Sequence, residues 1–167
     1  LHQLQNAPGA APGIEHDELA RLPGGPGPAS ITCVDYGPEH LDVQEVEDLD
    51  AFMSRHRPEW TAVRWISVDG LSDTRAIHAL ATKYNLHPLA IEDMLHKTQR
   101  PKIEPYSGEE DEMQARLFVV THAVQIQDGR LQNAQVSIFL GHKTVMTFQD
   151  TRSGEWDPLR QRLNVKG

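Results

Sequence analysis

The chain has 167 residues, 16 of them Lys or Arg and 24 Asp or Glu, and its formal net charge is −8. This length suits one domain with a tail, which can bury enough apolar surface to fold without disulfide bonds or zinc. The single Cys33 excludes an internal disulfide framework and a cysteine-rich zinc site. The acidic balance argues against nucleic acid as a partner, because phosphates are met by a basic stripe. No apolar run approaches the roughly 18 residues that span a bilayer, so we expect a soluble chain with no pore of its own.

Residues 1–28 differ in composition from the remainder of the chain. The first 30 residues contain five of the 11 Pro and five of the 12 Gly, and such a segment supports neither a long helix nor a central strand. We therefore predict a flexible Pro/Gly-rich leader over 1–28 and one domain over 29–167. The chain begins with Leu rather than Met, and we expect it to be a segment of a longer protein.

From residue 30 onward, strand and helix patterns alternate. The predicted strands cover 30–36, 41–47, 63–68, 101–106, 116–127, 131–140 and 143–149. The predicted helices cover 48–56, 74–84, a short stretch from Pro88 to Leu95, and a last segment from Asp157. The helix from Pro88 is expected to bury Leu89, Ile91, Met94 and Leu95. The mixture of hairpins and crossovers predicts an α/β fold, an α/β/α layered sandwich on a mixed, largely antiparallel sheet.

Catalytic motifs are missing from the sequence. None of the nine His forms an HExxH pair, and the GxSxG, Walker and GxGxxG patterns do not occur. One alternative is a small hydrolase-like enzyme that uses Asp93 with His96 or His87. It lacks a nucleophile placed sharply at a strand end, so we predict that the protein is not an enzyme.

The densest group of charged residues lies between 85 and 106. On the helix that Pro88 opens, Glu92 and Asp93 are adjacent carboxylates that lie off the apolar side. One interpretation is two surface pairs four residues apart, Glu92 with His96 and Asp93 with Lys97. The other is a carboxylate face for a hydrated divalent cation, since Mg²⁺ keeps several waters and often binds one or two carboxylates. Such an open half-site requires a second half from elsewhere.

Several short segments around this group carry residues that occur in the same order in a known protein family. They are 65–71, 86–89, 92–93, 99–104, Tyr106, 135–138, 145–149 and 156–160. Over about residues 30–164, the series resembles the N-terminal cytoplasmic domain of CorA-type magnesium/cobalt transporters. The acidic run 109–112 departs from the compact loop of that family.

The resemblance implies a domain in the wall of a cytoplasmic funnel, followed by a stalk helix and two membrane spans in a homopentamer. The Gly-Met-Asn pore tripeptide is absent here, so we expect only the regulatory, cation-sensing part, cut at the start of the stalk region. Its place would be the cytoplasmic face of the inner membrane. Its partners would be its own stalk and transmembrane segments, with no small-molecule substrate.

The resemblance also implies a metal role for the two adjacent carboxylates. Asp93 would join a weak regulatory Mg²⁺ site between subunits, and Glu92 would contribute to a second site nearby. Co²⁺ and Zn²⁺ are alternative ions. The alternatives for function are a zinc-transporting relative of the same fold and a freestanding interaction module that transports nothing.

Overall fold

A computed structural model describes residues 13–14, 16–25, 27–106, 115–152 and 154–164, among which seven strands form one sheet. In chain order they are β1 (Ser30–Tyr36), β2 (Leu41–Glu45), β3 (Val63–Asp69), β4 (Lys102–Pro105), β5 (Ala115–Gln127), β6 (Arg130–Gly141) and β7 (Thr144–Gln149). Across the sheet the order is β2-β1-β3-β7-β6-β5-β4. Of the described strand pairs, only β3 and β7 are parallel, so the expected mixed, largely antiparallel sheet is confirmed.

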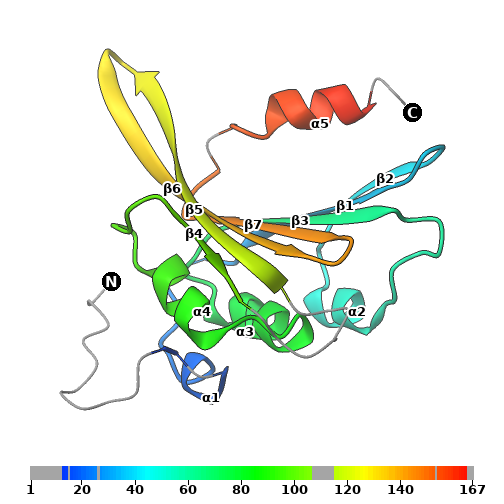
Figure 1. Cartoon of the computed structure of the whole chain (residues 1–167), viewed down its shortest axis with the longest axis horizontal. Helices are drawn as coiled ribbons and strands as arrows, with labels where there is room; N and C mark the ends of the chain where they lie inside the picture. The colour runs from blue at the N-terminus through cyan, green and yellow to red at the C-terminus, as the bar shows by residue number, and fades with distance from the viewer. Residues whose placement is uncertain (1–12, 15, 26, 107–114, 153, 165–167) are drawn as a thin grey trace.

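Helices lie on both faces of this sheet. They are α1 (His16–Leu19), α2 (Leu49–Ser54), α3 (Thr74–Lys83), α4 (Pro88–Leu95) and α5 (Asp157–Asn164). In Figure 1, α1 to α4 lie below the sheet and α5 lies above it. The predicted three-layer α/β/α arrangement is therefore confirmed.

The core forms where the apolar face of α3 packs against the sheet. Ile77 and Leu80 are completely buried, as their three-residue spacing predicts. The carboxylate of Asp73 caps the helix by accepting the N–H of Ala76 at 3.0 Å. On the sheet side, a chain of aromatic contacts crosses β5, β6 and β7 through Phe118, Phe139 and Phe148.

The opposite face of the sheet is covered in part by α5. Trp156, just before the helix, packs edge-on against Trp65 of β3 with 5.5 Å between ring centroids. The guanidinium of Arg160 lies 5.4 Å from the Trp65 ring. A cavity of about 440 Å³ that is lined mostly by apolar side chains remains beneath α5.

The α4 helix differs from its predicted packing at Leu89, and the expected burial of Leu95 is only partial. Ile91 and Met94 are buried as expected, but the side chain of Leu89 is 36% exposed. Ala90 is buried in its place, because the helix begins at Pro88 with His87 as its N-cap and turns residue 90 toward the core.

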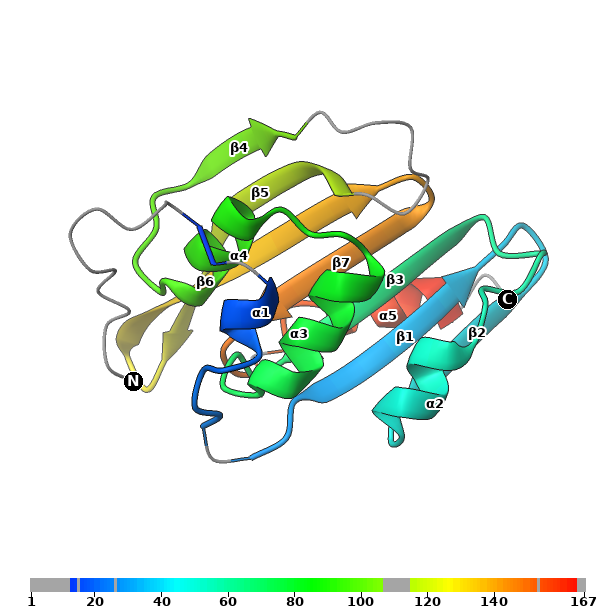
Figure 2. The same ribbon diagram turned by 90° about the horizontal axis from the view of Figure 1, so that it is seen from below.

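The predicted flexible leader needs correction for its described part. Ile14 is 2% exposed and Leu19 is completely buried, so both belong to the core. The N–H of Ile14 donates to the carbonyl oxygen of Pro88 at 3.2 Å. Figure 2 shows α1 beside α3 and α4. The physical reason is that a few apolar residues, spaced between the Pro and Gly turns, bury enough surface to dock without a long helix.

The leader residues 1–12 and the acidic run 109–112 lie outside the described residues. In the part of the chain that is described, no helix combines the length and the apolar character needed to cross a membrane.

Candidate cation-binding site

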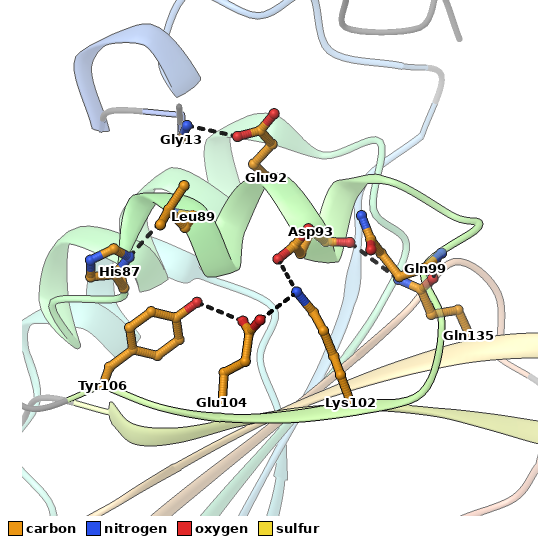
Figure 3. Close-up of polar contacts among 10 residues, drawn as sticks. All are labelled: Gly13, His87, Leu89, Glu92, Asp93, Gln99, Lys102, Glu104, Tyr106 and Gln135. Atoms are coloured by element: carbon orange, nitrogen blue, oxygen red, sulfur yellow. Dashed lines mark hydrogen bonds and ion pairs between the residues drawn. The ribbon is translucent and has the colours of Figure 1, made fainter. Parts of the chain in front are cut away.

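The two candidate metal ligands lie on α4 but point in different directions (Figure 3). Residues adjacent on a helix diverge by about 100°. Oε2 of Glu92 accepts the backbone N–H of Gly13 at 2.7 Å, while Oδ2 of Asp93 lies 2.5 Å from Nζ of Lys102. The structure therefore does not bring Glu92 and Asp93 into one site.

The predicted pairing of Asp93 with Lys97 is wrong. Lys97 pairs with Asp150, which follows β7, with 2.6 Å between Nζ and Oδ2. The partner of Asp93 is instead Lys102, which lies nine residues further along the chain on the edge strand β4. Tertiary packing of β4 beneath α4 thus replaces the local helix pair.

Lys102 bridges two carboxylates. Besides Asp93, its Nζ donates to Oε1 of Glu104 at 2.9 Å. The hydroxyl of Tyr106 donates to the other oxygen, Oε2 of Glu104, also at 2.9 Å. Alternate residues of a strand share one face, so β4 presents Lys102 and Glu104 together toward α4. We call Asp93, Lys102, Glu104 and Tyr106 the acidic cluster.

Neighbouring side chains hold the acidic cluster in place. The ring of His87 stacks on Tyr106 with 4.3 Å between centroids, and its Nδ1 accepts the N–H of Leu89. Gln135 of β6 donates from Nε2 to the carbonyl oxygen of Asp93 at 3.3 Å. Its Oε1 accepts the N–H of Gln99 at 3.0 Å, so one amide ties α4 and the following loop to the sheet.

Proton equilibria within the acidic cluster favour the charged ion pair. Burial opposes the charge on Lys102, but hydrogen bonds to Asp93 and Glu104 outweigh it and raise the pKa of the ammonium group. The hydrogen bond from Lys102 lowers the pKa of Glu104, against a smaller effect of burial. Burial and the nearby Glu104 charge raise the pKa of Tyr106, so its hydroxyl stays protonated and donates.

The atoms around Lys102 suit a hard divalent cation. Carboxylate oxygens from Asp93 and Glu104 are the donor type that Mg²⁺ prefers. Within the described residues, no group of three or more His, Cys, Asp and Glu is placed to hold an ion. A cation at Asp93 therefore needs further ligands from water or from another segment, and it competes with the ammonium group of Lys102.

Sequence reasoning singled out Asp93 and Glu92 but assigned no role to Lys102, Glu104 or Tyr106. An available signal was the alternation of charges on a predicted edge strand, which places Lys102 and Glu104 on one face. The link between this face and Asp93 required knowledge of how α4 packs on β4.

Comparison with solved structures shows that the fold is shared with the soluble domain of CorA and the cytoplasmic domain of ZntB. The soluble domain of CorA from Methanocaldococcus jannaschii aligns with a TM-score of 0.55 and 12% identity, covering 82% of this chain and 47% of that one. The cytoplasmic domain of ZntB from Vibrio parahaemolyticus aligns with a TM-score of 0.59 and 11% identity, covering 82% and 50%.

The family is established by sequence. The model of the CorA-like Mg2+ transporter protein family matches residues 60–167, and the chain belongs to this family. A curated relative, the cobalt/magnesium transport protein CorA of Thermotoga maritima, is 30% identical over 99 residues. That match covers 59% of this chain and 27% of the relative, so the chain spans little more than a quarter of its length.

Proposed function

We propose that this chain is the cation-sensing, regulatory domain of a CorA-like divalent-metal transporter that moves Mg²⁺ or Co²⁺, and that Asp93 is its sensing ligand. Family membership supports the transporter class, and the Thermotoga maritima relative is named for cobalt and magnesium. The observation that carries the sensing role is the acidic cluster. Asp93 and Glu104, both partly exposed, already share one cationic group, the ammonium of Lys102.

In this proposal Asp93 holds the ion together with an acidic residue of a neighbouring subunit. Bound Mg²⁺ supplies two positive charges and hydrogen-bond-donating waters between the carboxylates. Without it, two carboxylates about 4 Å apart repel each other by roughly 1 kcal/mol in a water-like medium. High cytoplasmic Mg²⁺ then draws subunits of a homopentamer together and closes the pore, which is negative feedback on uptake.

Lys102 sets the threshold of this response. Its ammonium group neutralises Asp93 when the divalent ion is scarce, so the ion must displace it. This competition keeps the affinity weak, which suits a sensor of an abundant cytoplasmic ion. Glu92 contributes to a second site nearby, for which its present partner, the N–H of Gly13, must give way.

The donor atoms favour magnesium over zinc as the regulatory ion. Zinc sites in proteins are rich in Cys and His, whereas the acidic cluster offers oxygen atoms only. The ZntB likeness, at 11% identity, concerns the fold alone. A non-catalytic role agrees with relatives that are named as transporters.

The proposal is tested by titrating the chain with Mg²⁺ and following backbone amide shifts by NMR. We expect saturable shifts in the millimolar range that concentrate on α4 and β4. Asp93→Asn should abolish them, while Glu39→Gln, the loss of an equal charge on an exposed turn, should leave them unchanged. Identical shifts in the wild type and Asp93→Asn would show that Asp93 does not bind Mg²⁺ in the isolated chain.

A further inference from the structure

A polar cavity lies away from the acidic cluster, on the other side of α3. It has a volume of about 460 Å³ and opens between the end of α2, the end of α3 and the turn between β6 and β7. Figure 2 shows α3 between α2 and α4, so the two regions are separate. Six basic residues line it and no acidic residue does: Arg55, His56, Arg57, Arg64, Lys83 and His142. We call it the basic pocket.

The charge of one of these residues is already compensated. Arg64 makes two hydrogen bonds, of 2.8 and 2.7 Å, to the carboxylate of the buried Asp35. This bidentate pair fixes the guanidinium between β1 and β3, and its charge is not available to a ligand. A ligand of the basic pocket can therefore interact only with the charges of the remaining residues.

Lys83 and Arg57 are held in place by neutral acceptors. Nζ of Lys83 donates to the carbonyl oxygens of Met53 and Arg55, at 2.5 and 3.1 Å, and Nη1 of Arg57 donates to that of Lys143 at 3.2 Å. These carbonyls satisfy two of the three lysine N–H groups and one of five on the arginine. They orient the side chains without cancelling their charge.

No carboxylate compensates these cations within the described part of the chain. The ion pairs there, made at up to 4.0 Å, involve neither Arg55 nor Arg57 nor Lys83. Burial and the nearby Arg64 charge lower the pKa of Lys83, as expected where positive charge is crowded. In a chain of net charge −8, this concentration of uncompensated positive charge is a local exception.

We infer that the basic pocket binds the phosphate groups of a soluble organic phosphate, of the size of a nucleoside polyphosphate. Guanidinium groups match phosphate oxygens bidentately, and an ammonium group adds a point charge. The volume falls in the range of about 300–1,000 Å³ that is typical of small-molecule pockets. Met53 and Tyr84 add apolar lining for the organic part of the ligand. This inference is independent of the proposed cation site.

The test is isothermal titration calorimetry of the chain with tripolyphosphate and with ATP, both without divalent metal. We expect saturable binding that weakens as salt rises, because the attraction is screened. The double variant Arg55→Gln/Arg57→Gln should lose at least about tenfold in affinity, since charge-assisted hydrogen bonds are removed. The matched control Arg130→Gln/Arg152→Gln makes the same charge change at exposed positions outside the basic pocket and should stay within about twofold.

Three outcomes would overturn the inference. The first is the absence of heat at millimolar tripolyphosphate and ATP. The second is an equal loss in both double variants, which would indicate general charge attraction. The third is binding to phosphatidylglycerol vesicles without binding to soluble phosphates, which would assign the basic pocket to a lipid headgroup. His142→Glu, on an exposed turn, gives an independent check and should weaken binding even if the arginine double variant folds poorly.

Discussion

In the proposed site, Lys102 competes with the cation for Asp93, because its ammonium group already lies against the carboxylate. Replacing Lys102 by Met keeps most of the side-chain volume and removes the charge. Partly exposed ion pairs contribute about 0.2–1 kcal/mol, so we expect the affinity of Mg²⁺ for the chain to rise by about 1.4- to fivefold. Calorimetric or NMR titration with Mg²⁺ measures this change.

The matched control is Lys97→Met, which removes the other lysine pair of this region, that with Asp150. It should leave the Mg²⁺ affinity unchanged, because Asp150 is not part of the acidic cluster. Equal affinities in wild type and Lys102→Met would contradict the idea that the ion and the ammonium group compete.

The ion pair of Lys102 with Glu104 should make the stability of the fold depend on pH. The pKa of Glu104 lies below its ordinary 4.5, so its pair stabilises the fold above that pH and is lost as pH falls through the folded-state pKa. The pKa of Lys102 lies above its ordinary 10.5, so its contribution is present below that pH and is lost as pH rises through the folded-state pKa. The stabilising window therefore runs between roughly pH 4.5 and 10.5.

Urea unfolding of wild type and Lys102→Met measures this window. We expect the wild type to be the more stable protein near neutral pH. The difference in unfolding free energy should shrink as pH falls below about 4.5, when Glu104 becomes protonated. A difference that stays constant down to about pH 3 would show that Glu104 does not contribute through its charge.

At the scale of residues, the sequence indicated one half of the site. The sequence pattern places the carboxylates of Glu92 and Asp93 side by side, away from the apolar face of their helix. It does not indicate their partners, because Lys102 and the backbone N–H of Gly13 reach Asp93 and Glu92 through tertiary contacts that no local spacing encodes. Whether Asp93 binds metal stays a prediction.

At the scale of elements, α1 is the part of the molecule whose docking is most open to test. Leu19 is completely buried against the core although it belongs to a four-residue helix. Replacing it by Ala should lower the free energy of unfolding by about 2–4 kcal/mol, as for other buried leucines. Urea unfolding followed by circular dichroism measures the loss.

Leu131→Ala is the control for this substitution, since that side chain is 70% exposed on the β5–β6 hairpin. Its effect should stay within about 0.5 kcal/mol. If Leu19→Ala were equally mild, α1 would not be docked in solution and a flexible leader would describe residues 16–25 after all.

The elements after residue 30 were the most predictable part of the fold. The strands β5, β6 and β7 begin and end within one residue of their expected positions, because the turn Asp128–Gly129 and the alternating apolar residues define a meander. The segment before residue 30 was missed because Pro and Gly dominate its composition, while its stability comes from a few buried side chains.

At the scale of the whole molecule, the homopentamer is an expectation from the family resemblance, which assigns assembly to a stalk helix and membrane spans. The match covers 27% of the Thermotoga maritima relative. We predict that the isolated chain is mostly a monomer or a weak dimer at micromolar concentration. Analytical ultracentrifugation tests this, and a stable pentamer would place the assembly energy in the domain itself.

The most direct test of the central claim is cation flux through the complete transporter in proteoliposomes, measured against internal Mg²⁺. If Asp93 is the sensing ligand, Asp93→Ala should shift the inhibition curve to higher Mg²⁺ or abolish inhibition, while the maximal flux is retained. Glu92→Ala should act in the same direction but more weakly. An inhibition curve for Asp93→Ala that coincides with that of the wild type would contradict the account and place the sensing site elsewhere.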